Sequence, residues 1–495
     1  MHDRKVMQTL RCVVCGDAEL SDGGTSELGC SRCGTVYPVI AGIPVLMSRP
    51  TAKVQEEHRR FQVARSRALA KAKNLEAFVD DHPRDSAAPR LRRMAAGIRA
   101  NQGLADELFE PVADYLSKGA DAPGESLHNF LYQAMALGYD FEILIAYLFQ
   151  DWAGGASFAA VRDRVLRGVS AHAEHPEEAL VLGSGAGGLA HALAGACRGV
   201  TAIDLSLPAQ LLAHRMIHGG DGLEVHLFKR ETAISSENDC AEVRLPPPPE
   251  AEGRIRLICG DAGRLPCLSA KTSLVVTQYL LDLVQDLERV VGEIHRVLAP
   301  GGLWINFGLP FQRAGEEATV GSRGHDELVE FFPQHGFELC EMDRVSFGLL
   351  DRSTVLADAA LVTEYPLFFV ARKREERDEP EESRRFFEFF SGRGEEVLGK
   401  VPLLRAEMGL TESEVYASSG KRSERGLWLG APGSARPVGS EQLAMIRGLL
   451  ENIGHGLSIG QLASGLSPGG PDRAQVGELV EVFRFLTERK ILALG

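Results

Sequence analysis

A glycine-rich turn constrains the fold of this chain more than any other feature. Residues 181–188 read Val-Leu-Gly-Ser-Gly-Ala-Gly-Gly, between an apolar run at 179–182 and a helix expected over 189–196. Glycine adopts positive φ readily and lets the backbone approach a ligand closely. A second apolar run, 199–203, ends at Asp204, whose carboxylate is placed to accept hydrogen bonds from ribose hydroxyls. We therefore expect a strand–turn–helix–strand unit that binds a nucleoside.

The glycine spacing narrows the class of ligand. The order G-x-G-x-G that begins at Gly183 differs from the dinucleotide pattern G-x-G-x-x-G, and no hydride-transfer partner is evident. It is similar to the first motif of class I S-adenosylmethionine (SAM) methyltransferases. Taken alone, the turn also fits a glycine-rich connection with no ligand. The SAM interpretation assigns these residues to the cofactor: Gly183, Ser184, Gly185, Gly187, Asp204, Asp261, Ala262 and Gln278.

The segment 160–373 alternates strands with helices. This alternation predicts an α/β fold with a mostly parallel sheet and helices on both faces. The resemblance implies the seven-stranded, Rossmann-like sheet of class I methyltransferases. Residues 233–253, with four prolines, are expected to be a long loop. Further strands are expected at 254–259, 273–277, 303–306 and 366–372, and helices at 287–298 and 327–335.

Four cysteines near the N-terminus predict a zinc site. Two C-x-x-C pairs, Cys12/Cys15 and Cys30/Cys33, can present four thiolates to one ion. Four protein ligands leave no open position for a catalytic water, so the zinc is expected to be structural. The segment 8–47 resembles the small zinc ribbon of the methyltransferase-activator family.

Composition limits the partners and the compartment. The chain has 495 residues and a net charge of −14, which argues against a general nucleic-acid binder. No apolar run of about 18 residues is present, so no membrane span is expected. The N-terminus lacks a signal-peptide core, and the other five cysteines are scattered. We therefore expect a cytoplasmic protein in a reducing compartment.

The remaining segments complete the expected domain organisation. Residues 1–50 form the ribbon, and 51–150 are helical, either as core packing or with part of the segment as a lid over the active site. Residues 151–375 form the methyltransferase domain. Residues 376–440 are a linker with mixed helix, and 441–495 resemble a winged helix that ends in a strand at 491–494. The acidic tail favours peptide docking or homodimerisation over DNA reading.

The order of motifs over residues 125–375 also resembles the carnosine N-methyltransferase family. The passages that carry this resemblance are Asp151-Trp152, 180–190, 236–249, 279–282, 298–308 and 367–373. The resemblance implies that Asp282 binds the imidazole of the substrate, with Tyr279 in the same catalytic site. A carboxylate that accepts the N–H of one ring nitrogen fixes the tautomer and leaves the other nitrogen free to attack. The alternative is that Asp282 caps a helix that begins near Leu283.

The resemblance implies three further substrate contacts, which are Asn306, Arg313 and Tyr365. Arg313 stands near the position of a family histidine, and it either meets a substrate carboxylate or is a surface loop residue. The tyrosines of the family are not in register with Tyr365. The pocket is therefore expected to accept a substrate other than carnosine.

These patterns predict a SAM-dependent N-methyltransferase. The expected substrate is an imidazole nitrogen of histidine, in a peptide or in a histidine-containing small molecule. Two alternative functions remain. One is a methyltransferase that acts on an oxygen or carbon of a natural product, and the other is a non-catalytic SAM-binding scaffold. An RNA methyltransferase is disfavoured by the acidic charge and by the sequence Thr277-Gln-Tyr-Leu280 after the fourth strand.

Overall fold

The computed structural model of this chain divides into two compact units. The larger unit holds the elements from β1 to β15, and the smaller one holds those from β16 to β20. The described residues are 10–16, 20–22, 26–118, 141–173, 176–228, 240–249, 254–284, 286–309, 325–344, 347–348, 363–364, 366–374, 402–404, 409–416, 422–430, 436–438, 453, 457–459, 461–462, 480, 483 and 492–494.

A mostly parallel sheet forms the centre of the larger unit. Its strands run in the order β9-β6-β5-β10-β11-β15-β12. The first five strands are parallel, whereas β15 is antiparallel to both β11 and β12. This order confirms the expected α/β, Rossmann-like class. The bounds are β5 Glu178–Leu182, β6 Gly199–Asp204, β9 Ile255–Gly260, β10 Thr272–Gln278, β11 Leu298–Gly308, β12 Phe337–Arg344 and β15 Leu367–Lys373.

The N-terminal cysteine segment extends this sheet. Strand β4 (Ile43–Leu46) pairs in parallel with β9, with Val45 opposite Cys259 and Leu46 opposite Gly260. Strands β1 (Leu20–Asp22), β2 (Glu27–Cys30) and β3 (Val36–Ile40) continue outward from β4. Among the described residues the sheet therefore has eleven strands rather than the expected seven. The prediction missed the extra pairing because it joins segments more than 200 positions apart.

Helices cover both faces of the sheet. Helix α6 (Ala156–His172) lies so close to one face that a Cβ added to Gly168 would be 2.8 Å from Cζ of Phe368. On the other face, Trp304 packs edge-on against Phe369 and Phe332, with ring centroids 4.8 and 5.7 Å away. The remaining helices around the sheet are α7 (Gly188–Leu193), α8 (Leu207–His218), α9 (Leu287–Val297) and α11 (His325–Gln334).

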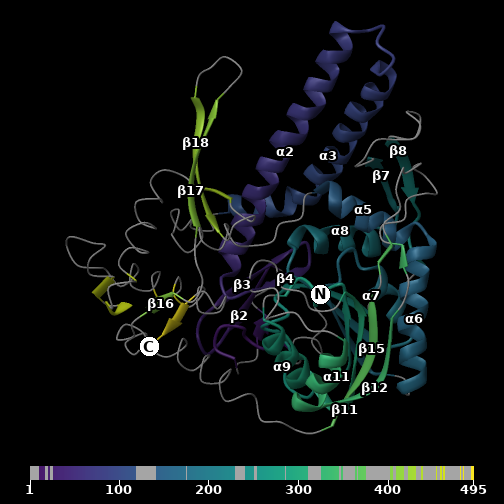
Figure 1. The fold of residues 1–495 in the computed structure, drawn as a ribbon, viewed down its shortest axis with the longest axis vertical. Helices are drawn as coiled ribbons and strands as arrows, with labels where there is room; N and C mark the ends of the chain where they lie inside the picture. The colour runs from purple at the N-terminus through teal and green to yellow at the C-terminus, as the bar shows by residue number, and fades with distance from the viewer. Residues whose placement is uncertain are drawn as a thin grey trace. The chain divides into compact units, whose positions relative to one another are not determined.

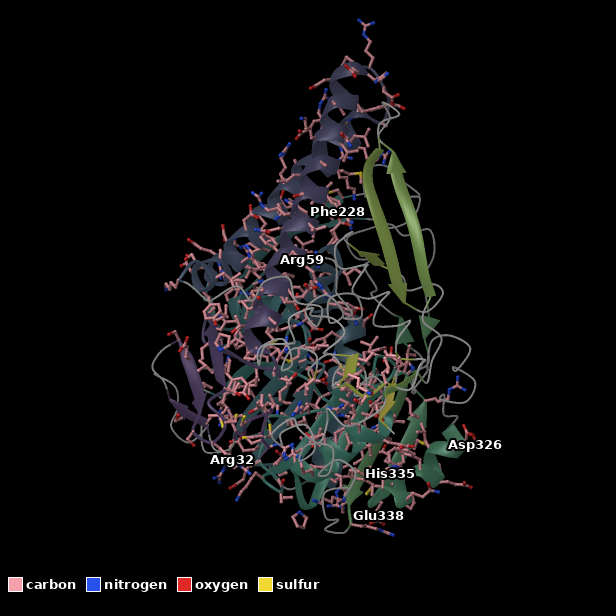
Figure 2. All side chains as sticks on the ribbon, turned by 90° about the vertical axis from the view of Figure 1, so that its left-hand side faces the viewer. Arg32, Arg59, Phe228, Asp326, His335 and Glu338 are labelled. Atoms are coloured by element: carbon pink, nitrogen blue, oxygen red, sulfur yellow. The ribbon has the colours of Figure 1, made fainter. Side chains whose placement is uncertain are left out.

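Two long helices lie side by side in the larger unit (Figure 1). They are α2 (Pro50–Asp81) and α3 (Ala88–Ser117), and α5 (Phe141–Trp152) follows. The expected helical character of residues 51–150 is confirmed where the structure describes them. The rings of Phe61 and Phe109 stack at 4.1 Å between the pair. Figure 2 shows Phe228 beside these helices, where it packs against a small cluster of Ala72, Ala95 and Ile98.

An antiparallel hairpin corrects the prediction of a loop at 233–253. Strand β7 (Leu223–Phe228) pairs with β8 (Cys240–Leu245), so the described part of that segment includes a strand. Helix α3 covers the hairpin, since Asn101 exchanges two hydrogen bonds with the backbone of His226, at 2.7 and 2.8 Å. A covered strand edge is protected from pairing with other chains.

The smaller unit is described only in part. Strands β17 (Gly409–Tyr416), β18 (Arg422–Gly430) and β19 (Arg436–Val438) form one sheet, so the mixed helix expected for 376–440 was wrong there. The expected terminal strand is confirmed as β20 (Leu492–Leu494), which pairs with β16 (Pro402–Leu404). The winged-helix expectation is not confirmed by the few helical residues described. A short pair, β13 (Phe347–Gly348) and β14 (Thr363–Glu364), belongs to the larger unit. Among the described residues no helix has the length and apolar character to span a membrane.

Candidate functional site

The predicted glycine loop lies at the carboxyl end of β5. Gly183, Gly185 and Gly187 all have positive φ, at 69°, 51° and 86°. A Cβ added to Gly183 would lie 3.1 Å from the backbone oxygen of Gln278, and one added to Gly187 would lie 3.0 Å from Cδ1 of Ile217. A Cβ added to Gly185 would meet no atom within 4 Å. Gly185 therefore presents its backbone to open space, where a ligand can approach.

Asp204 fixes the turn from the neighbouring strand. Its Oδ2 accepts a hydrogen bond from the N–H of Gly185 at 2.9 Å, and its Oδ1 accepts one from Ser206 at 2.8 Å. Burial raises the pKa of this carboxyl, while the two backbone N–H groups and Lys53 act in the opposite direction. Each carboxylate oxygen has two lone pairs, so both can still accept a ribose hydroxyl.

Ser184 lies beneath the loop rather than beside the open space. It is 1% exposed, and its hydroxyl accepts a 2.8 Å hydrogen bond from Nε2 of Gln210 on α8. This bond holds the loop on α8. The direct cofactor contact predicted for Ser184 is therefore not supported for its side chain.

The third strand end brings Asp261 and Ala262 to the same edge of the sheet. Oδ1 of Asp261 accepts from the N–H of Gly263 at 2.8 Å, and the backbone of Asp261 bridges to Arg264. Both residues are half-buried. Because β9 lies next to β6, this turn and the carboxylate of Asp204 share the carboxyl ends of neighbouring strands.

The turn after β10 carries the predicted catalytic residues. Tyr279 has a positive φ of 44°, and its N–H donates to the backbone oxygen of Phe307 at 2.9 Å. A bulky residue with positive φ is uncommon and marks local strain. A Cβ added to Gly183 would be 3.3 Å from Cβ of Leu280, so this turn contacts the glycine loop.

Asp282 lies in that turn with an unsatisfied carboxylate oxygen. Its Oδ1 is buried and has no hydrogen-bond partner among the described residues. Burial raises the pKa of the carboxyl. The capping alternative was wrong, because α9 begins at Leu287 and its cap is Asp286, which accepts from the N–H of Arg289 at 3.2 Å. Gln278 likewise has a buried Oε1 without a partner in the described part of the chain.

Asn306 does not fit the predicted substrate contact. It is fully buried in β11, and its Oδ1 accepts from the hydroxyl of Thr277 at 2.8 Å. Its Nδ2 donates to the backbone oxygen of Leu367 at 2.9 Å. The amide therefore ties neighbouring strands together. Arg313 and Tyr365 lie outside the described residues.

The four N-terminal cysteines converge as predicted. Their sulfur atoms all lie within 4.8 Å of one another, with 3.6 Å between Cys12 and Cys33 and between Cys15 and Cys30. A tetrahedral zinc ion with Zn–S bonds of about 2.3 Å requires sulfur separations of about 3.8 Å. The cluster is therefore compatible with structural zinc. The hydroxyl of Tyr37 lies 3.0 Å from Sγ of Cys12, a typical outer contact of a metal ligand.

A comparison with protein families covers the strand ends that carry Asp261, Gln278 and Asp282. Residues 230–306 match the family model described as a methyltransferase domain. This part of the chain is similar to a methyltransferase domain. This match and the strand order bear out the expected enzyme class, a SAM-dependent methyltransferase. A comparison with curated proteins gave no match. The resemblance to carnosine N-methyltransferases in particular stays a hypothesis.

Several solved structures match parts of the chain at low identity and low TM-score. A candidate methyltransferase from Bacillus halodurans is 16% identical and covers 43% of this chain and 99% of its own, with a TM-score of 0.31. The N-methyltransferase NodS from Bradyrhizobium japonicum, in complex with S-adenosyl-L-homocysteine, is 14% identical and covers 51% and 100%, with a TM-score of 0.31. A chain from the complex of the Haloferax volcanii Trm112 methyltransferase activator with a methyltransferase is 16% identical and covers 48% and 100%, also with a TM-score of 0.31.

The sequence-based assignment missed two residues at the glycine loop. Asp151 and Trp152, at the end of α5, both form hydrogen bonds to this loop. The sequence analysis used this pair only as part of a resemblance. An acidic residue and a tryptophan at the end of an apolar helix gave no local indication of the loop that they contact.

Proposed function

We propose that this chain binds SAM at the carboxyl ends of β5, β6, β9 and β10. The open space at Gly185 and the spare lone pairs of Asp204 fit the methionine part and the ribose of the cofactor. Asp261 and Ala262 are placed for the adenine edge. The unpartnered Oε1 of Gln278 fits a donor such as the ammonium group of the cofactor.

We further propose that Asp282 binds an imidazole N–H of the substrate. The observation that carries this proposal is its buried Oδ1 without a hydrogen-bond partner among the described residues. A buried carboxylate oxygen without a partner is costly, so a donor supplied by the ligand would stabilise it. An imidazole N–H is such a donor, and it leaves the second ring nitrogen unprotonated.

The chemistry then needs little from the protein besides alignment. SAM supplies an electrophilic methyl group on its sulfonium. The ring nitrogen opposite Asp282 attacks that carbon in line, so the N–C bond forms while the S–C bond breaks and its electron pair returns to sulfur. Asp282 takes the proton from the other ring nitrogen, which returns the methylated ring to its neutral form. The raised pKa of Asp282 favours this proton transfer.

Other residues have supporting roles in this proposal. Tyr279, whose positive φ shapes the turn that carries Asp282, is proposed to line the same site. Arg313 and Tyr365 stay predicted substrate contacts. The cysteine cluster is proposed to hold zinc, and the C-terminal segment to dock a peptide substrate or a second copy of the chain.

Methyl transfer from radiolabelled SAM tests the proposed function. The acceptor panel contains carnosine, free histidine and histidine-containing peptides, and tandem mass spectrometry locates the methyl group. Label on a ring nitrogen in at least one acceptor is expected. Label only on oxygen or carbon acceptors in a wider panel would favour a natural-product methyltransferase. SAM binding without transfer to any acceptor would favour a scaffold.

A further inference from the structure

The end of helix α5 forms a hydrogen bond to the start of α7. Oδ2 of Asp151 accepts from the N–H of Gly188 at 3.1 Å, and Asp151 is 9% exposed. Gly188 is the first residue of α7 and follows the glycine loop directly. A buried carboxylate that accepts from a backbone N–H stabilises the conformation in which that N–H points toward it.

The next residue of α5 contacts the same loop from a second direction. Nε1–H of Trp152 donates to the backbone oxygen of Ala186 at 2.9 Å. The indole ring also lies edge-on to the ring of His191, with centroids 5.3 Å apart. The Trp152 side chain is therefore fixed at both its polar and its apolar parts.

The two hydrogen bonds lie on either side of one loop residue, Gly187. The carbonyl of Ala186 and the N–H of Gly188 belong to the two peptide groups on either side of Gly187. Gly187 has a φ of 86°, a conformation that few residues other than glycine adopt. Fixing both peptide planes around Gly187 fixes the turn, and with it the direction in which Gly185 faces.

The packing shows that this contact is close. A Cβ added to Gly188 would lie 2.7 Å from Cβ of Asp151 and 3.0 Å from Cζ of Phe158. No side chain can therefore separate α5 from the loop. A Cβ on Gly185, by contrast, would meet no atom within 4 Å, so α5 does not fill the space beside Gly185.

We propose that Asp151 and Trp152 are positioning residues for the cofactor. They hold the glycine loop in its binding conformation before the cofactor arrives, which lowers the entropy that binding would otherwise lose. This inference rests on the proposed SAM site and deepens it. Part of the affinity for the cofactor then comes from two side chains that do not contact the cofactor.

The test combines cofactor binding with hydrogen exchange on the full-length chain. Asp151→Ala removes the acceptor, Asp151→Asn keeps an oxygen in its place, and Trp152→Phe removes the donor while keeping an aromatic ring. Asp163→Ala, which removes an exposed carboxylate that pairs with Arg162 on α6, is the matched control. The affinity for S-adenosyl-L-homocysteine is measured by titration calorimetry. Exchange of the amides in residues 183–193 is measured without ligand.

Loss of one hydrogen bond to the loop is expected to weaken binding about tenfold. Asp151→Ala and Trp152→Phe should each show this loss, with faster exchange in residues 183–193 and unchanged exchange in α9 and α11. The affinity of Asp151→Asn should stay within about threefold of the wild-type affinity. Asp163→Ala should bind with the wild-type affinity.

Two outcomes would overturn the inference. One is unchanged affinity in both Asp151→Ala and Trp152→Phe. The other is an exchange increase spread equally over the whole larger unit, which would mean that the pair only stabilises the fold. If the wild type binds no cofactor product at all, the proposed function fails, and the local exchange in residues 183–193 alone decides whether Asp151 and Trp152 hold the loop.

Discussion

Nη2 of Arg11 lies 3.2 Å from Oε2 of Glu293, although the two residues are 282 positions apart in the chain. Their side chains are 6% and 8% exposed. Arg11 directly precedes Cys12, the first residue of the cysteine cluster, and Glu293 is on α9. The same glutamate accepts from Arg296 at 2.7 Å and from the N–H of Leu265 at 2.6 Å. This buried ion pair attaches the cysteine segment to the methyltransferase sheet.

Breaking this ion pair is expected to destabilise the chain. Arg11→Met should lower the free energy of unfolding by about 3 kcal/mol, because it leaves a buried carboxylate with one cation fewer. Glu293→Gln should lower it more, since it removes the carboxylate that pairs with both Arg11 and Arg296. Urea unfolding followed by circular dichroism measures both. Arg65→Met, in an exposed pair with Asp106, is the control and should change stability by less than about 1 kcal/mol. Equal, small losses in all three variants would contradict this account.

Acid should weaken the same ion pair. Burial alone would raise the pKa of Glu293, but Arg296 and Arg11 outweigh it and hold the pKa below the ordinary value of 4.5. A depressed pKa in the folded state means that the stabilisation is present above pH 4.5 and is lost as the pH falls through the folded value. The stability difference between the wild type and Glu293→Gln should therefore shrink below pH 4.5. A difference that stays constant down to pH 3 would refute the ionised pair.

Asp151 should show the opposite dependence on pH. Burial raises its pKa from 3.8 to about 7, so the unfolded chain releases its proton at lower pH than the folded chain does. Stability is thus lost as the pH rises from 3.8 to about 7, by up to about 4 kcal/mol. Asp151→Asn removes this loss. The variant should gain stability relative to the wild type between pH 5 and pH 8 in thermal unfolding, and parallel pH curves would speak against a buried carboxyl with a raised pKa.

Removal of metal is expected to affect more than the ribbon. The cysteine cluster is followed by β4, which pairs with β9 at the edge of the methyltransferase sheet. A chelator that removes one zinc ion per chain should lower the melting temperature and expose the edge of β9 to hydrogen exchange. Cys33→Ser should reproduce the effect. Protein purified without metal that melts at the same temperature as the loaded protein would exclude a structural zinc.

Substitutions at two glycines of the loop should affect cofactor binding and stability differently. A Cβ at Gly187 would be crowded by Ile217 and Ala213, whereas a Cβ at Gly185 would enter open space. Gly187→Ala should therefore lower the free energy of unfolding by about 2 kcal/mol or more. Asn tolerates the left-handed φ of 51° at position 185, so Gly185→Asn should change stability less. It should weaken cofactor binding at least tenfold, because the side chain enters the proposed ligand space. Equal binding by Gly185→Asn and wild type would place the cofactor elsewhere.

Substitution of Asp282 should lower turnover without weakening cofactor binding. Asp282→Asn keeps the shape of the side chain but cannot take the ring proton. Its kcat is expected to fall at least a hundredfold with imidazole acceptors, while the affinity for SAM changes less than about threefold. Single-turnover kinetics and calorimetry provide the two numbers. Unchanged turnover in Asp282→Asn would remove the imidazole role.

The parts of the fold predicted from the sequence depend on local chemistry. Three glycines in one turn and a carboxylate at the end of the next strand require a particular backbone, and the structure has positive φ at all three glycines. The predicted strands β5, β6, β9, β10, β11 and β15 follow from apolar runs separated by turn residues. These signals are contained within short windows of the chain.

The parts that were missed depend on contacts between distant segments. Pairing of β4 with β9 and of β7 with β8 is decided by tertiary packing, which no short window contains. Asn306 was assigned to the substrate on the resemblance, but its amide oxygen accepts a hydrogen bond from Thr277 on the neighbouring strand. Asp151 was named only as part of the resemblance, and the fold brings it to Gly188.

Calorimetric titration of the wild type and Asp204→Asn with SAM tests the central claim most directly. We expect one SAM per wild-type chain and an affinity at least tenfold weaker in Asp204→Asn, with circular dichroism showing both chains folded. Absence of binding to the folded wild type, or equal binding by the two chains, would contradict a SAM site formed by the glycine loop and Asp204.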